Sequence, residues 1–198
     1  ETDKPALRTE AERTLGRLID EAVSRDSIST SIATAADRND DPDIQHAMIR
    51  LLGRCSTTIA MQRISAALKS QDSATRLAAT VALGNWKDVR AINELLKHLG
   101  AVKEPTLRHK AFEALLKVSS SDFIFKDQTK AQEIWSKIRT EATSRQEKLE
   151  FINALATATN DYAAPWALSL VQPLASDADP NVAERAKKAV AYITNKEA

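Results

Sequence analysis

The chain has little of what an all-β fold requires. Among its 198 residues there are only four glycines, and aromatic residues account for 5%. Antiparallel sheets use turn glycines and aromatic strand residues in greater numbers, so this composition favours helices. The hydrophobic share of 43% and the charged share of 28% are those of an ordinary globular protein.

The low cysteine content, the near-zero net charge and the lack of long apolar runs limit the covalent cross-links and the partners that the chain can have. A single cysteine, Cys55, excludes an intrachain disulfide, and a formal net charge of +1 provides no overall attraction to nucleic acid or membrane surfaces. The chain has no run of about 18 apolar residues, so no transmembrane segment is expected. The first residue is Glu1 and no signal peptide is recognisable. We therefore interpret residues 1–198 as a single domain from a longer protein.

Prolines and glycines recur at fixed places in a repeating frame. Four of the six prolines precede a leucine or valine by ten residues, and three of the four glycines (Gly16, Gly53 and Gly84) directly follow a leucine in that register. The frame occurs six times, with the key residues Leu15, Leu52, Leu83, Leu115, Leu155 and Val190. Their spacings of 37, 31, 32, 40 and 35 residues are typical of helical-pair repeats.

Each copy of the frame predicts one amphipathic inner helix. Three copies begin with an aspartate suited to the N-cap: Asp41, Asp72 and Asp179. Proline suits the first helical position, and apolar or small residues follow at helical spacing, forming one buried stripe per helix. Further helices are predicted between the copies, at residues 27–37, 57–69, 89–99, 128–142 and 161–175. Pro173 should kink or end the last of these.

The stretch around residues 119–127 is the one irregular piece. It contains Phe123 and Phe125, and the sequence leaves open whether these form a lid, a packing plug or a disordered tip.

Residues 72–84 resemble the short bacterial form of the HEAT-like repeat, through Asp72, Arg76, Ala79 and the Ala-Leu-Gly that ends the segment. The resemblance covers nearly the whole chain, with departures in the fifth copy, where Arg145 and Phe151 replace proline and alanine. It implies an all-α fold, a right-handed α-solenoid of about 5.5–6 helix pairs, in which the first pair is represented only by its inner helix. The family is a scaffold class with no fixed chemistry.

A second resemblance concerns residues 83–88 and 104–116. These look like the helical arrays of secreted multidomain proteins from environmental bacteria. That likeness implies a secreted or periplasmic location and leaves a cytoplasmic one open.

No catalytic, metal or cofactor site is predicted, and we expect no enzyme. Nucleophile motifs, paired-carboxylate motifs and glycine-rich phosphate loops are not recognisable. The histidines His46, His98 and His109 do not show metal-ligand spacing. His46 and His109 share a repeat position but lie two layers apart, and layers of helices are about 10 Å thick.

Arginines recur seven positions before the key residue, as Arg8, Arg76 and Arg108. They predict either a basic ladder or, as is common in the family, pairs with acidic turn residues of the neighbouring unit. The last helix carries further cations: Arg185, Lys187, Lys188 and Lys196. These suggest an alternative, a nucleic-acid-binding protein of the HEAT-like DNA glycosylase type, although Glu184 and Glu197 interrupt the run.

An interaction surface is predicted on the inner helices of the second to fourth copies. In each inner helix, the residues two, five and six positions before the key residue should face the concave side of the solenoid. The residue three positions before the key residue should lie next to them on that surface. Apolar residues there, rimmed by polar ones, are typical of a protein-binding groove. The candidate partner-binding residues are His46, Ile49, Arg50, Leu77, Thr80, Val81, His109, Phe112 and Glu113.

The same apolar residues have a second interpretation, in which the rotation is wrong by one residue and they belong to the core. The sequence thus predicts a non-catalytic scaffold that binds a protein or peptide on its concave face. A structural spacer in a secreted multidomain enzyme is a further alternative.

Overall fold

The computed structural model describes residues 4–158 and 165–197, which form helices and no strand. The helices are α1 (Lys4–Glu21), α2 (Arg25–Asp37), α3 (Pro42–Cys55), α4 (Thr58–Ala67), α5 (Ser73–Leu83), α6 (Arg90–Ala101), α7 (Pro105–Ser119), α8 (Asp122–Phe125), α9 (Gln128–Glu141), α10 (Arg145–Ala158), α11 (Trp166–Val171), the 3-10 helix η1 (Gln172–Ser176) and α12 (Pro180–Glu197). The predicted all-α class is confirmed.

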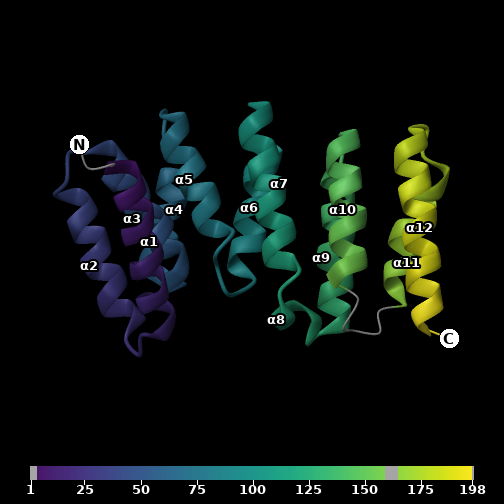
Figure 1. Ribbon diagram of the computed structural model, residues 1–198, viewed down its shortest axis with the longest axis horizontal. Helices are drawn as coiled ribbons and strands as arrows, with labels where there is room; N and C mark the ends of the chain where they lie inside the picture. Colours follow the sequence, from purple (N-terminus) through teal and green to yellow (C-terminus); the bar gives the residue numbers. More distant parts are fainter. Residues whose placement is uncertain (1–3, 159–164, 198) are drawn as a thin grey trace.

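The helices stand side by side along the long axis of the molecule (Figure 1). The front row consists of α1, α3, α5, α7, α10 and α12, in which each helix packs against the next. The back row consists of α2, α4, α6, α9 and α11, each packed against front-row helices. The predicted α-solenoid is therefore confirmed, and the front row is the set of inner helices defined by the repeating frame.

The predicted N-caps start their helices as expected. The Asp41 carboxylate accepts a hydrogen bond from the Asp43 amide (2.9 Å), and the Asp72 carboxylate accepts one from the Thr75 amide (2.7 Å). Asp179 accepts bonds from two amides at the start of α12. Each aspartate satisfies donors that the first turn of a helix leaves unpaired.

The fifth copy, which lacks the proline, begins α10 by another device. Glu147 donates its amide to the Ser144 hydroxyl (3.2 Å), and the Ser144 amide donates back to the Glu147 carboxylate (2.9 Å). This reciprocal arrangement is a capping box, recognisable in the sequence as Ser-x-x-Glu. Phe151 is fully buried, with its ring centroid 5.9 Å from that of Trp135. The aromatic side chain that replaces the repeat alanine is therefore accommodated in the core.

The repeat glycines lie where adjacent front-row helices approach most closely. A Cβ at Gly53 would overlap the backbone carbonyl of Ala82 in the next helix, and one at Gly84 would lie 3.1 Å from the Ala114 Cβ. The recurrence of glycine in this register therefore reflects the spacing of the row, since a side chain at Gly53 would force α3 and α5 apart.

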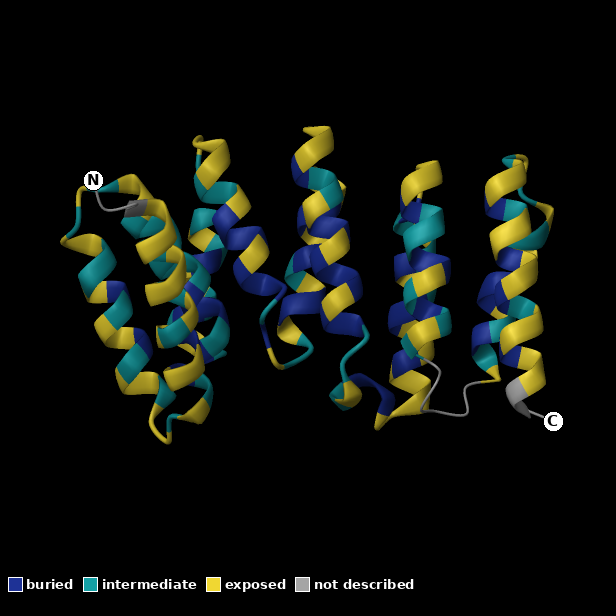
Figure 2. Cartoon of the chain, viewed as in Figure 1, coloured by how far each residue is buried: buried dark blue, intermediate teal, exposed yellow. Residues whose placement is uncertain are grey.

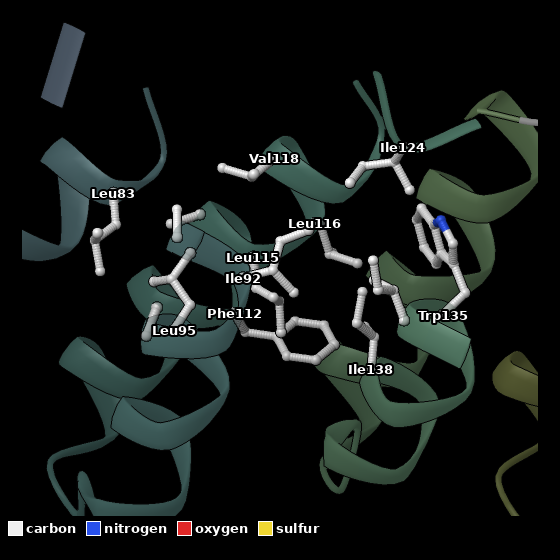
Figure 3. Packing of buried hydrophobic residues seen from close by; sticks show 14 of the residues in the cluster. Leu83, Ile92, Leu95, Phe112, Leu115, Leu116, Val118, Ile124, Trp135 and Ile138 are labelled. Atoms are coloured by element: carbon white, nitrogen blue, oxygen red, sulfur yellow. The ribbon is translucent and has the colours of Figure 1, made fainter. Parts of the chain in front are cut away.

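The core lies between the rows and is continuous through the middle layers. Figure 3 shows Phe112 and Leu115 of α7 between side chains of α6, such as Ile92, and of α9, such as Ile138. The leucine of the frame is buried at Leu52, Leu83, Leu115 and Leu155. At Leu15 the predicted burial is wrong, because this side chain is 48% exposed at the end of the row.

The irregular stretch is a packing plug. It forms the short helix α8, in which Ile124 and Phe125 are buried. The Phe125 ring centroid lies 6.5 Å from that of Trp135 and 6.3 Å from that of Trp166. The insertion thus fills the space between α9 and α11 with aromatic side chains.

The predicted helix at residues 161–175 has two parts. Residues 161–164 lie outside the described residues. Beyond them, α11 ends at Val171 and Pro173 lies in the first turn of η1. The expectation that Pro173 ends the α-helix is confirmed.

Candidate interaction surface

The outward face of the front row carries the positions two and six before the key residue. On α5 these are Val81 and Leu77, both 38% exposed and one helical turn apart. On α7, Glu113 is exposed and His109 is half-buried. In Figure 2, exposed residues run as a stripe along the outward side of these helices. The rotation predicted for these two rows is therefore correct on α5 and α7. The row five positions before the key residue was also expected to face outwards, and this is correct for the exposed Lys110 but wrong for the buried Ala78.

On α5 and α7 the row three positions before the key residue faces inwards, so this part of the prediction is wrong there. Thr80 and Phe112 are fully buried. The Thr80 hydroxyl donates to the Arg76 carbonyl (2.9 Å), while Ile49 is partly buried against the core. An interior helix contacts both row neighbours and the back row, which widens its buried face beyond a single stripe. Neither Thr80 nor Phe112 can contact a partner.

The predicted residues on α3 bridge neighbouring helices. Arg50 makes two hydrogen bonds to the carboxylate of Glu12 in α1, at 2.8 and 2.7 Å. His46 Nε2 lies 3.1 Å from the Thr75 hydroxyl and 3.4 Å from the Asp72 carboxylate, both at the start of α5. These side chains hold the front row together, and the open part of the surface is on α5 and α7.

A hollow of about 320 Å³ lies between α5 and α7 at this surface. Leu77, Val81 and Ala114 form its apolar part. Charged and polar side chains surround them: Asn85, Lys110, Glu113 and Lys117. Lys110 pairs with Glu113 at 2.7 Å, and Lys117 donates to the Asn85 amide oxygen at 2.7 Å. The rim is therefore polar and ordered around an apolar centre.

The repeat arginines pair with acidic residues of the next unit, which confirms the second of the two predictions for them. The pairs are Arg8 with Asp41 and Asp43, Arg76 with Glu104 (3.0 Å) and Arg108 with Glu147 (3.0 Å). Lys148 occupies the same position in the fifth copy and pairs with Asp177 at 2.6 Å. The ladder joins successive layers and leaves these cations bound within the protein.

Two cations of the last helix, Arg185 and Lys188, have partners within the chain, whereas Lys187 is exposed. The Arg185 guanidinium donates to the Asn153 side chain, and Lys188 pairs with Glu184 at 2.6 Å. The Lys196 side chain lies outside the described residues. This pairing weakens the nucleic-acid alternative, which needs cations available to phosphates.

His109 has neighbours that histidine spacing alone did not indicate. Its Nε2 lies 3.4 Å from the Glu113 carboxylate and its Nδ1 lies 3.7 Å from that of Glu150 in α10. One potential ligand atom from each of the three residues lies within 4.8 Å of the others. Glu113 is four residues from His109 on one helix face, whereas Glu150 arrives only through the packing of α10 on α7.

Two buried groups, Cys55 on the front-row helix α3 and His98 on the back-row helix α6, illustrate the low polarity of the interior. Burial raises the pKa of the Cys55 thiol to about 11. Burial also lowers the pKa of the His98 imidazole, and the nearby Arg76 charge acts in the same direction. Both effects disfavour the charged form of a side chain removed from water.

Comparison with known proteins identifies the repeats. Residues 29–116 match the family model described as HEAT repeats. These residues extend from α2 into α7, and the predicted resemblance to HEAT repeats is confirmed there. HEAT repeats generally mediate protein interaction or scaffolding and are typically non-catalytic.

Comparisons with solved structures and with curated proteins do not indicate a function for the chain. The crystal structure of an engineered protein is similar to the chain, with 19% sequence identity, a TM-score of 0.43, and coverage of 98% of this chain and 93% of that one. Comparison with curated proteins gives no match. No described helix combines the length and apolar content needed to cross a bilayer.

Proposed function

We propose that the protein is a non-catalytic scaffold that binds a short segment of a protein partner over the hollow between α5 and α7. The observation that carries this proposal is the exposure of Leu77 and Val81, one turn apart on the outward face of a HEAT repeat helix. An apolar centre with a polar rim is the usual composition of a peptide-binding surface. In the family resemblance this row lines the concave side.

The apolar pair is specific to α5. At the same two repeat positions, the other front-row helices carry at least one polar residue: Thr9/Arg13, His46/Arg50, His109/Glu113, Leu149/Asn153 and Glu184/Lys188. A solvent-facing position has no structural need for leucine or valine, because a polar side chain keeps its hydration there. The change of character at α5 therefore supports a binding role for this part of the row.

The rim indicates the chemistry of the partner segment. Lys110 and Lys117 flank the hollow, and Glu113 is the one acidic residue among those that line it. The surplus of positive charge favours a segment with an apolar anchor residue flanked by acidic residues. The anchor would lie against Leu77, Val81 and Ala114.

The test uses peptide display selection on the intact chain, followed by affinity measurement. We expect selected peptides to carry an apolar residue flanked by acidic ones. Replacing both Leu77 and Val81 by serine should weaken their binding about tenfold or more. The matched control replaces Leu7 and Leu18, equally apolar and exposed residues of α1, and should leave the affinity unchanged. Circular dichroism should show full helicity in both variants.

Two outcomes would contradict the proposal. Equal loss of binding in both variants would place the peptide elsewhere, and failure to select any peptide would favour the spacer interpretation. Salt-sensitive binding of duplex DNA by the same preparation would instead favour the nucleic-acid alternative.

A further inference from the structure

Three side chains with metal-binding chemistry meet at the junction of α7 and α10. His109 and Glu113 are four residues apart and share one face of α7. Glu150 of α10 approaches the opposite edge of the imidazole ring. The side chains of His109 and Glu150 are partly exposed, at 36% and 20%, whereas Glu113 is exposed at 43%. The three groups come from two helices that pack against each other.

The distances fit a small divalent ion. Zinc binds histidine nitrogen and carboxylate oxygen at roughly 2.0–2.2 Å in a tetrahedral arrangement, which places adjacent ligand atoms about 3.3 Å apart. His109 Nε2 and the nearer Glu113 oxygen are 3.4 Å apart. Glu150 lies nearest to Nδ1, on the other side of the ring. Rotation of the imidazole and of the carboxylate is therefore needed to bring all three residues to one ion, and one ligand atom of each already lies within 4.8 Å of the others. Three protein ligands leave a fourth position for water.

One oxygen of Glu150 lacks a compensating donor. Its Oε2 is buried and accepts no hydrogen bond from a described residue, since His109 Nδ1, at 3.7 Å, lies beyond hydrogen-bonding distance. Its Oε1 accepts a hydrogen bond from the Gln146 side chain at 2.6 Å. A buried carboxylate oxygen without a partner is costly, and a bound cation would remove that cost. Gln146 would then orient the ligand from outside the coordination shell.

Lys110 is the group that an ion must displace. Its ammonium lies 2.7 Å from Glu113 and neutralises one of the two carboxylates. The long side chain is exposed and can move into solvent. Binding of a metal ion should thus compete with the Lys110–Glu113 ion pair. Removal of the Lys110 ammonium should therefore change the affinity for the ion.

We propose that His109, Glu113 and Glu150 bind a divalent transition-metal ion of the Zn²⁺ class. Imidazole selects such ions over Mg²⁺ and Ca²⁺, which prefer oxygen ligands alone. The site shares Lys110 and Glu113 with the rim of the hollow, but the proposal does not rest on peptide binding there. It assigns a new site at the next junction of the front row.

His46 provides an internal control, because it occupies the same repeat position on α3. Its Nε2 lies 3.4 Å from the single carboxylate of Asp72, and the residue four positions on is Arg50 in place of a glutamate. The same kind of side chain is thus present in a similar setting without the second and third ligands.

The test is calorimetric titration of the intact chain with Zn²⁺, together with absorption spectra of its Co²⁺ complex. We expect one bound ion per chain. His109→Ala and Glu150→Gln should each weaken binding by about tenfold or more, and His46→Ala should leave it unchanged. Lys110→Ala should strengthen binding severalfold, because the competing ammonium is removed. Circular dichroism of the metal-free variants should match the parent chain.

Several results would overturn the assignment. These are an absence of Zn²⁺ binding by the parent chain, equal weakening by His46→Ala, or equal affinity for Mg²⁺ and Zn²⁺. Glu150→Gln preserves side-chain shape, so retained affinity in that folded variant would also exclude the site, even if His109→Ala failed to fold.

Discussion

The middle of the solenoid and its N-terminal end place the same repeat residue in opposite environments. Leu115 of α7 is completely buried, whereas Leu15 of α1, at the same position of the frame, is 48% exposed. In the middle, a front-row helix has neighbours on both sides of the row and behind it. At α1 the front-row neighbour among the described helices is α3. Burial in a repeat array therefore depends on neighbouring units as much as on the local pattern.

The two ends of the row also differ from each other. On α12 the exposed face is largely polar, with Glu184, Lys187 and Lys188. On α1, Leu7 and Leu18 are exposed together with Leu15. Among the described residues, α1 thus presents an exposed apolar face, whereas the exposed face of α12 is largely polar.

The largest expected effect is on the free energy of unfolding. It should distinguish the repeat leucine in the middle of the solenoid, Leu115, from the one at its N-terminal end, Leu15. Leu115→Ala should lower the free energy of unfolding by about 2–5 kcal/mol, because it leaves a cavity in a packed layer. Leu15→Ala should change it by less than about 0.5 kcal/mol. Urea denaturation followed by circular dichroism measures both. Equal effects would mean that Leu15 is buried in solution.

The second prediction concerns the closest contact between front-row helices. Gly53→Ala should destabilise the chain by about 1–3 kcal/mol, because the new methyl group overlaps the Ala82 carbonyl and the helices must separate. Gly100→Ala is the control. A Cβ added at this helical position would contact no other part of the protein within 4 Å, so the change should be neutral or slightly stabilising. Thermal unfolding of the two variants provides the comparison. A stable Gly53→Ala variant would show that the row can widen at little cost.

The third prediction compares the two ends of the arginine ladder. Glu147 is buried, accepts hydrogen bonds from the Thr143 and Ser144 amides and contacts Arg108. Glu147→Gln should cost about 1–3 kcal/mol. Asp43→Asn, at the exposed partner of Arg8, should cost at most about 1 kcal/mol. Similar losses in chemical denaturation would show that burial does not strengthen the ladder.

The pH dependence of stability follows from the same glutamate. Although burial opposes ionisation, its backbone hydrogen bonds and the Arg108 charge lower the pKa of Glu147 below the usual value. The folded state therefore holds its proton less tightly than the unfolded state. The stabilisation is complete above the ordinary glutamate pKa of about 4.3 and is lost as the pH falls towards the lowered pKa. Glu147→Gln should flatten the stability profile in this acidic range.

The last prediction concerns the chemical reactivity of the buried Cys55 thiol. Because burial raises the pKa of Cys55 to about 11, the folded chain should react with a thiol reagent at pH 8 at least about a hundredfold more slowly than the unfolded chain. A cysteine introduced at the fully exposed Val23, in a Cys55→Ser background, should react at the unfolded rate. Rapid labelling of native Cys55 would indicate frequent opening of the second layer.

Much of the architecture was predictable from residue pattern. Proline, glycine and aspartate at fixed offsets located the front-row helices and their first turns, and repeat arginines indicated the ladder. The fifth copy was underestimated because its Ser144 and Glu147 form a capping box in place of Asp-Pro. The Phe125 plug was beyond pattern analysis, since its ring partners Trp135 and Trp166 are brought to it by tertiary packing.

The sequence by itself determined the helices, their register and the repeat class, because caps and periodicity act within a few residues along the chain. Only the tertiary structure decided which faces meet other helices. It buried Phe112 and Thr80, left Leu77 and Val81 at the surface and exposed Leu15. It also brought Glu150 to His109, 41 positions away. The physical reason is that burial and ligand geometry depend on the number and position of neighbouring helices, which local spacing does not contain.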